Sequence, residues 1–440
     1  MKSKLLLITA ILFSFLAPLT PLQAGYISDV PLTLTELVKI ALENHPSTKQ
    51  AWWNANRAAA ALGSAKSNYY PDINFNAGAA NGRDFKFING PDTSYTIVGV
   101  DLFLSMLLLD FGERKAIVDM AQSSLLAANW QLDWNIQKVM LKTLEHAYST
   151  LLAQEILQAA EISLKEAEKM LNAAKELNRT GLTPVTDVYT TQATYSQSKM
   201  DLIQQQASLD IQRGKLAASL GVSASTPLTL TFPETTLFQK LEQIDMLICT
   251  ALRQRSDLMA KRARLQELRF NQVRTNASYL PKVTFSGRGG FNKALHDKAN
   301  SGQYRVAIDF ETPIFNGFET TYQNRIAYAD VKISHEELLE LQIEISLEVL
   351  TYSRTVQAAQ EMIPEAEVNL NSSVKAYEGV LEKYKAGKEG ITELSWAQRQ
   401  LAAARVRYSE VKTKLLVSIA NLAYATGTLA PYMETPCLEN

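Results

Sequence analysis

The stretch NRTGLTPVTDVYTTQATYSQSKMDLIQQQASLDIQRGKL, residues 178–216, decides the fold. After its glycine, large side chains return every seven residues, at Val188, Tyr195, Leu202, Leu209 and Leu216. Heptads sustained over this length are typical of α-helices that pack side by side with a left-handed supercoil. The sequence therefore predicts a long coiled-coil helix that begins soon after Gly181.

A still longer helical pattern precedes this helix. From Gly112 to Thr180 hardly any turn signal interrupts the chain. Roughly 65 helical residues at ~1.5 Å each extend about 100 Å, far beyond the length of a globular helix. Gly181 stands where the two helices reverse, a place where the tolerance of glycine for positive φ is useful. We therefore expect an antiparallel helical hairpin whose tip is at Gly181.

The chain contains this plan twice. Residues 37–81 match residues 247–291 without a gap, and the tip glycine Gly181 is matched by Gly387. The difference in residue number between equivalent positions changes only from 210 (37 to 247) to 206 (181 to 387). The heptads recur in the second copy, at Leu394, Leu401, Tyr408, Leu415 and Leu422. Self-similarity of this kind indicates internal duplication.

We assign the first repeat to residues 25–230, the second to 231–430 and a C-terminal tail to 431–440. The long helices of the two repeats are expected at about 112–221 and 317–427, and Pro364 is the one internal breaker of the second pair. Shorter helical patterns precede them, at about 33–45, 46–69, 242–254 and 256–279. A Tyr-x-Pro sequence then stops the helix in each copy, because proline disfavours helical geometry in the residue before it.

Strand patterns lie between the short and the long helices, at about 72–104 and 282–312. Polar and apolar residues alternate there, most clearly from Tyr304 to Glu311, which is typical of strands with one apolar face. Four strands leave two open edges, which membranes forbid and soluble proteins avoid. Sharing strands among identical copies would close them, although the periodicity does not fix the number of copies. A soluble sandwich is the alternative for the same alternation.

The first 24 residues have the layout of a secretory signal peptide. Lys2 and Lys4 precede an apolar run, and small residues follow up to Ala24. An uncleaved anchor is the alternative, but a spanning helix needs about 20 apolar residues, and Pro18 and Pro21 break the run. We therefore expect an exported protein with a signal peptide at residues 1–24.

Composition excludes some classes of protein. The formal net charge is −1, which argues against a nucleic-acid surface. Cys249 and Cys437 are the only cysteines, too few for a disulfide scaffold, and whether they pair stays open. The four histidines are scattered without metal-ligand spacing, and no Gly-x-Ser-x-Gly nucleophile motif occurs. We therefore expect no catalytic residues, no metal site and no cofactor.

These features, in this order and twice over, resemble the TolC-type outer-membrane efflux family across residues 30–430. The resemblance rests on the duplicated Leu-x-x-x-Ala-Leu starts, the Tyr-x-Pro stops, and the tips Thr-Gly-Leu-x-x-x-Thr-Asp-Val and Tyr-Lys-Ala-Gly. It implies a mostly α fold with a transmembrane β part. Three copies would form an α-helical barrel of long coiled-coil hairpins across the periplasm. That barrel would continue into a shared 12-stranded β-barrel, three times the four strands expected per chain, in the outer membrane.

The resemblance implies a passive exit duct, not an enzyme. The chain would be an outer-membrane channel subunit of a tripartite efflux or type I secretion system. Its partners would be two further copies, outer-membrane lipid, a periplasmic adaptor (membrane fusion) protein and an inner-membrane pump of the RND, ABC or MFS type. Facing the barrel lumen would be the polar strand residues Arg288, Arg305, Asp309 and Glu311.

The hairpin tips carry the adaptor-docking residues that the resemblance implies. These are Arg179, Thr180, Gly181 and Leu182 in the first tip and Ala386, Gly387 and Lys388 in the second. From the residues alone each tip is a tight turn, and both interpretations can hold together.

Candidate gate residues lie just inside the tips: Asp187, Tyr384, Glu389, Glu393 and Trp396. Asp187 and Glu393 occupy equivalent positions, so three copies would bring six carboxylates to the narrow end, where acidic rings favour cations. An ordinary solvated helix face is the alternative. Glu389 replaces a basic latch residue of the family and Trp396 an acidic one, so the latch differs here. Trp396 could instead form an apolar constriction.

A structural protein without transport, such as a trimeric coiled-coil adhesin or envelope spacer, is the main rival. Adhesin stalks are parallel and need no hairpin tips, so the two glycine reversals argue against it. The cargo stays open among drugs, proteins and metals. Residues 175–190 and 380–396 contain no Met, His or Cys, which lowers the expectation of a dedicated metal path.

Overall fold

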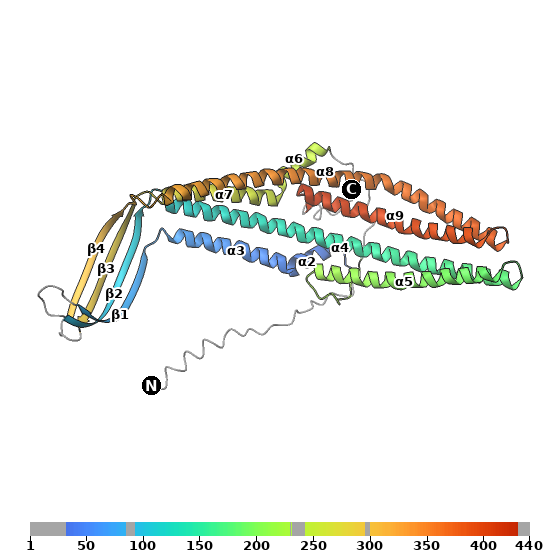
Figure 1. Ribbon diagram of the computed structural model, residues 1–440, viewed down its shortest axis with the longest axis horizontal. Coiled ribbons are helices and arrows are strands. Elements are labelled where there is room, and N and C mark those ends of the chain that lie inside the picture. The colour runs from blue at the N-terminus through green and yellow to red at the C-terminus, as the bar shows by residue number, and fades with distance from the viewer. Residues whose placement is uncertain (1–31, 85–92, 229, 231–242, 295–299, 430–440) are drawn as a thin grey trace, which may run out of the picture.

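The computed structural model describes residues 32–84, 93–228, 230, 243–294 and 300–429. The predicted signal peptide, the C-terminal tail and Cys437 lie outside these residues, whereas Cys249 is a free, exposed thiol. The molecule is long and thin, with a four-stranded sheet at one end and helices along the rest of its length (Figure 1).

Each repeat contains two short helices, two strands and two long helices, as predicted. The first comprises α2 (Leu34–Asn44), α3 (Pro46–Ser67), β1 (Asp72–Asp84), β2 (Thr93–Leu109), α4 (Glu113–Arg179) and α5 (Val185–Ser219). The second comprises α6 (Ile244–Gln254), α7 (Ser256–Ala277), β3 (Lys282–Ala294), β4 (Asn300–Glu311), α8 (Glu319–Lys385) and α9 (Ile391–Thr426). One predicted boundary was wrong: β2 ends at Leu109 rather than near 104, because the apolar run after Asp101 continues as strand through an irregularity between Leu107 and Leu109.

The helix ends follow from local chemistry. A capping box starts α2, since the Thr33 side chain accepts a hydrogen bond from the Glu36 amide and the Glu36 carboxylate accepts one from the Thr33 amide. Pro46 is the first residue of α3, where its missing N–H costs nothing. Pro364 lies inside α8 without ending it.

The junction between β2 and α4 is fixed by a buried ion pair. The Asp110 carboxylate accepts a hydrogen bond of 2.7 Å from the Arg114 amide and one of 3.1 Å from the Arg114 Nε. The same guanidinium donates to the carbonyl oxygens of Leu107 and Leu108 at the strand end. Strand and long helix are therefore held as one continuous unit.

The sheet has the order β1-β2-β3-β4, and every pair is antiparallel. The central β2–β3 pairing joins the two repeats, whereas β1 and β4 are the two edges. Among the described residues no further strand pairs with either edge, as the sequence predicted.

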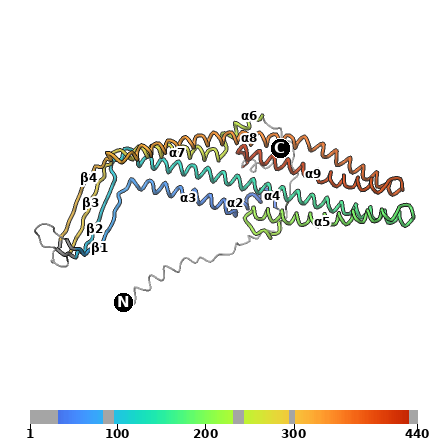
Figure 2. The backbone as a smooth tube through the Cα atoms, viewed as in Figure 1, coloured from blue at the N-terminus to red at the C-terminus, as the bar shows by residue number. Residues whose placement is uncertain are grey.

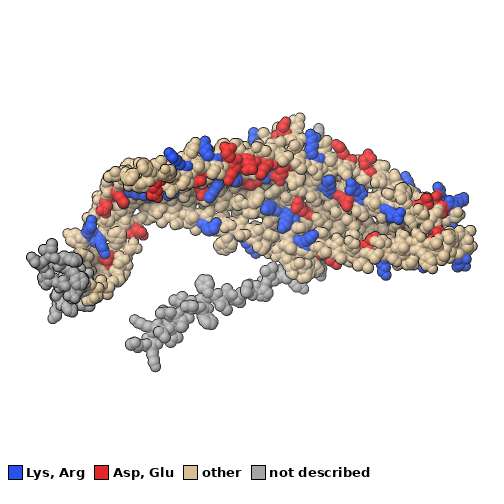
Figure 3. All heavy atoms as spheres, in the orientation of Figure 1, with Lys and Arg blue, Asp and Glu red and all other residues tan. Residues whose placement is uncertain are grey.

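The helices form a curved layer rather than a globule (Figures 1 and 2). Next to the sheet, α3, α4, α7 and α8 lie side by side in this order, and α5 and α9 return along α4 and α8 from the far tips. Among the described residues, buried apolar side chains gather in clusters spaced along the layer. Acidic side chains gather over the stretch of α8 beside α7, where Glu336, Glu337, Glu340 and Glu344 are exposed (Figure 3). No helix among the described residues is both long enough and apolar enough to cross a membrane.

Candidate functional site

The sheet has one polar face and one apolar face. The register pairs Arg288 with Arg305, Thr284 with Asp309 and Lys282 with Glu311. Directly paired residues point to the same side, so the four predicted lumen residues share one face. The lumen assignment itself remains a prediction.

The opposite face is apolar and uncovered in the single chain. Its side chains range from 41% exposed at Val100 to 89% at Tyr304. They are Ile73, Phe75, Val98, Val100, Leu102, Phe291, Tyr304, Val306, Ile308 and Phe310. An apolar patch of this extent is unusual on a free monomer surface and indicates a face that meets lipid or protein.

Asp101 is the polar-face residue that sequence reasoning missed. Its carboxylate accepts two hydrogen bonds from the Arg288 guanidinium, of 3.2 Å from Nε and 3.0 Å from Nη2. The Asn76 amide donates to the same carboxylate at 3.1 Å, so one network crosses β1, β2 and β3. Farther along, Ser286 Oγ donates to Asp309 at 2.8 Å. Asp101 borders an apolar run in the sequence, and only the register brings it to Arg288.

Both hairpin tips are the same glycine-ended turn. Gly181 and Gly387 have φ of 78° and 68°, in the left-handed region that favours glycine. The next amide closes each turn, Leu182 N to Leu177 O at 2.9 Å and Lys388 N to Lys383 O at 2.9 Å, the Schellman pattern. Leu182 is 67% exposed. The predicted docking residues therefore lie at the far ends of the helical layer (Figure 1).

Tyr384 and Asp187, two of the predicted gate residues, meet although they belong to different hairpins. Tyr384 is 1% exposed and packs with Met170, Ala174 and Leu177 of α4. Burial, together with the charge of Asp187 and its hydrogen bonding, raises the pKa of Tyr384 to about 12. By ordinary hydrogen-bond geometry the buried Tyr384 hydroxyl has no partner, so its contact with Asp187 is electrostatic rather than a well-formed hydrogen bond.

The remaining gate residues are not brought together with that pair. Glu389 lies 3.8 Å from the Lys383 ammonium within the second tip. Glu393 and Trp396 are exposed on α9, and Trp396 is 58% exposed. The equivalent sequence positions of Asp187 and Glu393 thus have different surroundings within one chain, since Asp187 is partly buried against the other hairpin.

A series of polar contacts between α4 and α9 was not predicted. The Arg405 guanidinium donates to both oxygens of Glu166, at 2.9 and 2.7 Å, and the two side chains are only 17% and 12% exposed. Lys412 pairs with Glu155 at 3.5 Å, and the Asn421 amide donates to Glu145 at 3.4 Å. These contacts tie the second hairpin to the first.

Burial raises the pKa of the neighbouring Tyr377, with a further contribution from the charge of Glu166. The Tyr377 hydroxyl has no hydrogen-bond partner. The charged pair between the hairpins is therefore largely buried.

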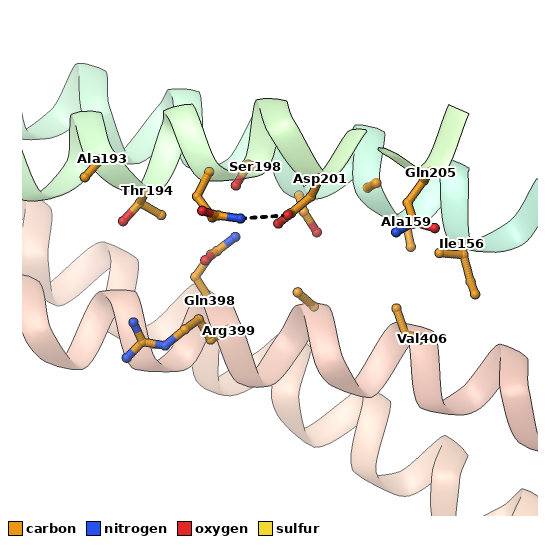
Figure 4. Close-up of a pocket in the computed structure, with 14 residues that line it drawn as sticks. Ile156, Ala159, Ala193, Thr194, Ser198, Asp201, Gln205, Gln398, Arg399 and Val406 are labelled. Atoms are coloured by element: carbon orange, nitrogen blue, oxygen red, sulfur yellow. Dashed lines mark hydrogen bonds between the residues drawn. The ribbon is translucent and has the colours of Figure 1, made fainter. Parts of the chain in front are cut away.

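A cleft of about 580 Å³ with a mixed polar and apolar lining lies between the two hairpins, bounded by α4, α5 and α9. Gln197 donates to Asp201 at 2.8 Å along α5, and Gln398 reaches from α9 across the cavity (Figure 4). Gln398 is 4% exposed. Among the residues that the structure describes, no three His, Cys, Asp or Glu side chains gather where they could hold a metal ion.

Comparison with known proteins matches two regions, 37–222 and 247–428, to a family described as outer membrane efflux protein. The chain is 24% identical over 403 residues to protein CyaE of Bordetella pertussis, covering 90% of this chain and 84% of that protein. It is 23% identical over 407 residues to the outer membrane protein TolC of Vibrio cholerae, covering 90% and 91%. The fold matches the solved outer-membrane channel OprN with a TM-score of 0.81 at 18% identity, over 90% of both chains.

Proposed function

Since the matched regions cover most of its length, the chain belongs to the outer membrane efflux protein family, and we propose that three copies form the exit duct of an efflux or secretion system. The observation that carries this proposal is the two-faced sheet, uncovered on its apolar side, open at both edges and continuous with two long hairpins.

Closure of the sheet follows from its edges. In the proposed assembly β4 of one copy pairs with β1 of the next, and three copies of four strands give a barrel of 12 strands. A closed barrel leaves no unpaired backbone in lipid. The apolar face then meets outer-membrane lipid, and the polar face with Arg288, Arg305, Asp309 and Glu311 lines the lumen.

The hairpins would continue the duct through the periplasm and meet their partners at the tips. The two tips share one turn geometry and expose Leu182 and Lys388 at the far end. A periplasmic adaptor protein would dock on the two turns, Arg179 to Leu182 and Ala386 to Lys388. An inner-membrane pump of the RND, ABC or MFS type would supply the energy, and this chain would contribute a passage and no chemical step.

The narrow end of the duct would be controlled by residues just inside the tips. Asp187 and Tyr384 lie in contact between the two hairpins of one chain. At the second tip the Glu389 carboxylate pairs with the Lys383 ammonium. With Glu393 and Trp396 exposed, each copy would present an acid and an aromatic ring toward its neighbour or the passage. The cargo follows from the pump rather than from this chain.

Single-channel recording in planar bilayers tests the duct. The purified protein should give discrete conductance steps. Ile308→Asp, which places a charge on the apolar face, should reduce insertion, because a charge on the lipid face of a barrel is destabilising in a depth-dependent way. Ser301→Asp, at an exposed polar-face position, is the matched control and should insert normally. A protein that never conducts under any voltage or gating condition would support the rival structural role.

Adaptor docking is tested by crosslinking in cells. In a background of Cys249→Ser and Cys437→Ser, Leu182→Cys or Lys388→Cys should capture a periplasmic adaptor. Lys39→Cys, exposed on α2 in the middle of the molecule, should not. Equal capture from all three positions, or from none, would contradict docking at the tips.

A further inference from the structure

In each repeat, the corner between the two short helices packs against the glycine that follows the second long helix. A Cβ on Gly221 would lie 3.0 Å from the Cα atom of His45, and a Cβ on Gly427 would lie 3.3 Å from that of Arg255. Equivalent positions differ by 210 in the short helices (46 to 256) and by 206 in the long ones (113 to 319). Side chains at this place can therefore be compared between the repeats.

Five equivalent positions define what we call the first and the second junction. Four of the five differences remove a carboxylate or add a basic side chain in the first junction, and the fifth replaces arginine by histidine. From the second junction to the first they are Arg255 to His45, Asp257 to Ser47, Glu348 to Lys142, Tyr352 to His146 and Asn421 to Lys215.

The second junction balances its charge from within the chain. Arg255 is buried, and its guanidinium donates to Asp257 at 2.7 Å and to Glu348. Because an unpaired buried charge is strongly destabilising, the two carboxylates serve as the counter-ions of this guanidinium.

The basic side chains of the first junction lie within reach of one another's charge. Burial, and then the charge of Lys142, lower the pKa of His45. Burial, and then the charges of Lys142 and Lys215, lower the pKa of His146. Both rings therefore lie in a field that opposes a further positive charge and attracts a negative one.

No carboxylate among the described residues neutralises this charge. Neither Lys142 nor Lys215 forms an ion pair within that part of the chain. Glu145 accepts a hydrogen bond of 3.4 Å from Asn421 of α9 instead, and Glu43, near the end of α2, is exposed. The first junction thus has the backbone of the second but lacks its internal counter-ions.

His45 also offers a hydrogen-bond donor at this place. Its Nδ1 accepts a hydrogen bond of 3.2 Å from the Ser47 amide and lies 2.6 Å from the Ser47 hydroxyl oxygen. The neutral ring therefore carries its proton on Nε2, which can donate to a ligand.

We propose that the first junction binds a small oxyanion, the phosphate or carboxylate group of a small molecule, in place of the carboxylates that the second junction provides for itself. Lys142 and Lys215 supply the charge, and His45 and His146 supply ring N–H groups. Oxyanions form their strongest hydrogen bonds with such charged and N–H donors. The bound anion joins the corner between α2 and α3 to the hairpin of α4 and α5.

Binding of inorganic phosphate to the purified protein in detergent tests the site. Equilibrium dialysis with radiolabelled phosphate should show saturable binding, and the thermal unfolding midpoint should rise with phosphate concentration by mass action. Sodium chloride at the same ionic strength is the control for charge screening. A rise that chloride reproduces in full, or the absence of saturable binding, would overturn the proposal.

A transplant of the second junction into the first tests the counter-ion argument. The variant carries His45→Arg, Ser47→Asp and Lys142→Glu, and it should fold because the second repeat holds the same residues on the same backbone. Its own carboxylates replace the ligand, so its phosphate affinity should fall by about tenfold or more. Phosphate affinity equal to that of the unchanged protein would contradict the proposal.

Removal of the two ammonium groups is a milder test. Lys142→Gln with Lys215→Gln changes exposed side chains of α4 and α5, and phosphate affinity should fall by about tenfold or more. Lys165→Gln with Lys199→Gln, also exposed on α4 and α5 but outside the junction, is the matched control and should bind phosphate normally. Equal affinities in the two double variants would overturn the assignment of the site.

Discussion

The two repeats have the same backbone fold but carry different charged side chains at equivalent positions. In each, a short helix pair meets the end of a long hairpin at a left-handed glycine, Gly221 in the first repeat and Gly427 in the second. A Cβ on this glycine would meet the backbone of Asn44 and His45 in the first repeat and of Gln254 and Arg255 in the second. The residue that caps the end of the short helix is His45 in the first repeat and Arg255 in the second. The difference at this one position shows how an internal duplication can keep a fold while its halves take on different tasks.

Arg255 is the centre of an ionic network. It is 7% exposed, and its guanidinium donates to Asp257, to Glu348 and to the carbonyl oxygen of Ala425. Burial alone would lower the pKa of Arg255, but its hydrogen bonds and charge interactions with the two carboxylates outweigh burial and raise it.

His45 has a far weaker set of contacts. Its Nδ1 accepts a hydrogen bond of 3.2 Å from the Ser47 amide. Burial, and to a smaller extent the charge of Lys142, lower the pKa of His45. The second repeat is thus tied by ion pairs to its own long helix through Arg255 and to the first repeat through Arg405.

The largest expected effect comes from Arg255→Ala. It leaves Asp257 and Glu348 without their shared cation, and breaking a buried ion pair costs about 3–5 kcal/mol. His45→Ala removes only a helix-capping contact and should cost about 1 kcal/mol. Denaturant unfolding of the detergent-solubilised protein, followed by helical circular dichroism, measures both. Equal losses of unfolding free energy would show that the two junctions are equally strong, which would contradict the larger role of the Arg255 network.

The next effect tests the contact between the hairpins. Arg405→Ala should lower the free energy of unfolding by about 3 kcal/mol, because Glu166 stays largely buried without a partner. The equivalent substitution in the first repeat, Lys199→Ala, removes an exposed side chain and should cost about 0.5 kcal/mol or less. The same unfolding assay serves for both. A Lys199 variant as unstable as the Arg405 variant would contradict this difference between the two repeats.

Glycine substitutions compare the junction with the tip. At Gly221 a Cβ would lie 2.9 Å from the backbone carbonyl of Asn44, in addition to the strain of φ 74°. At Gly181, with φ 78°, no atom lies within 4 Å of it. Gly181→Ala should cost about 1 kcal/mol for the left-handed backbone alone, and Gly221→Ala about 2 kcal/mol or more. Thermal unfolding midpoints would show which of the two substitutions destabilises the protein more. A larger loss from Gly181→Ala than from Gly221→Ala would contradict close packing at the junction.

The smallest effect is a dependence on pH that belongs to the first repeat. Burial and Lys142 lower the pKa of His45, and burial with Lys142 and Lys215 lowers the pKa of His146. The folded chain therefore resists protonation that the unfolded chain accepts, so stability should fall as pH drops through the usual histidine pKa of 6.5. His45→Gln with His146→Gln should flatten this part of the stability profile. If the slope of stability against pH is unchanged in the double variant, other groups are responsible for it.

Much of this architecture was predictable from the sequence because it is periodic. Heptads and the absence of turn signals located the four long helices, and alternation placed Arg288, Arg305, Asp309 and Glu311 on one face of the sheet. The end of β2 was missed, because a continuous apolar run gives no period from which to read a strand boundary.

The long-range charged contacts were not predictable in the same way. Glu166 and Arg405 are 239 residues apart, and heptads identify the packed face of a helix but not which distant helix covers it. Charged residues beside a heptad seam resemble an ordinary solvated face. Asp101 likewise acquires its partner Arg288 only through the strand register.

The mass of the complex extracted from membranes in mild detergent, measured by native mass spectrometry, tests the central claim most directly. In the proposed duct the open edges β1 and β4 pair with further copies of the same chain. We predict a complex of three chains. A protein released as single chains, or as pairs, would contradict the closed three-fold duct.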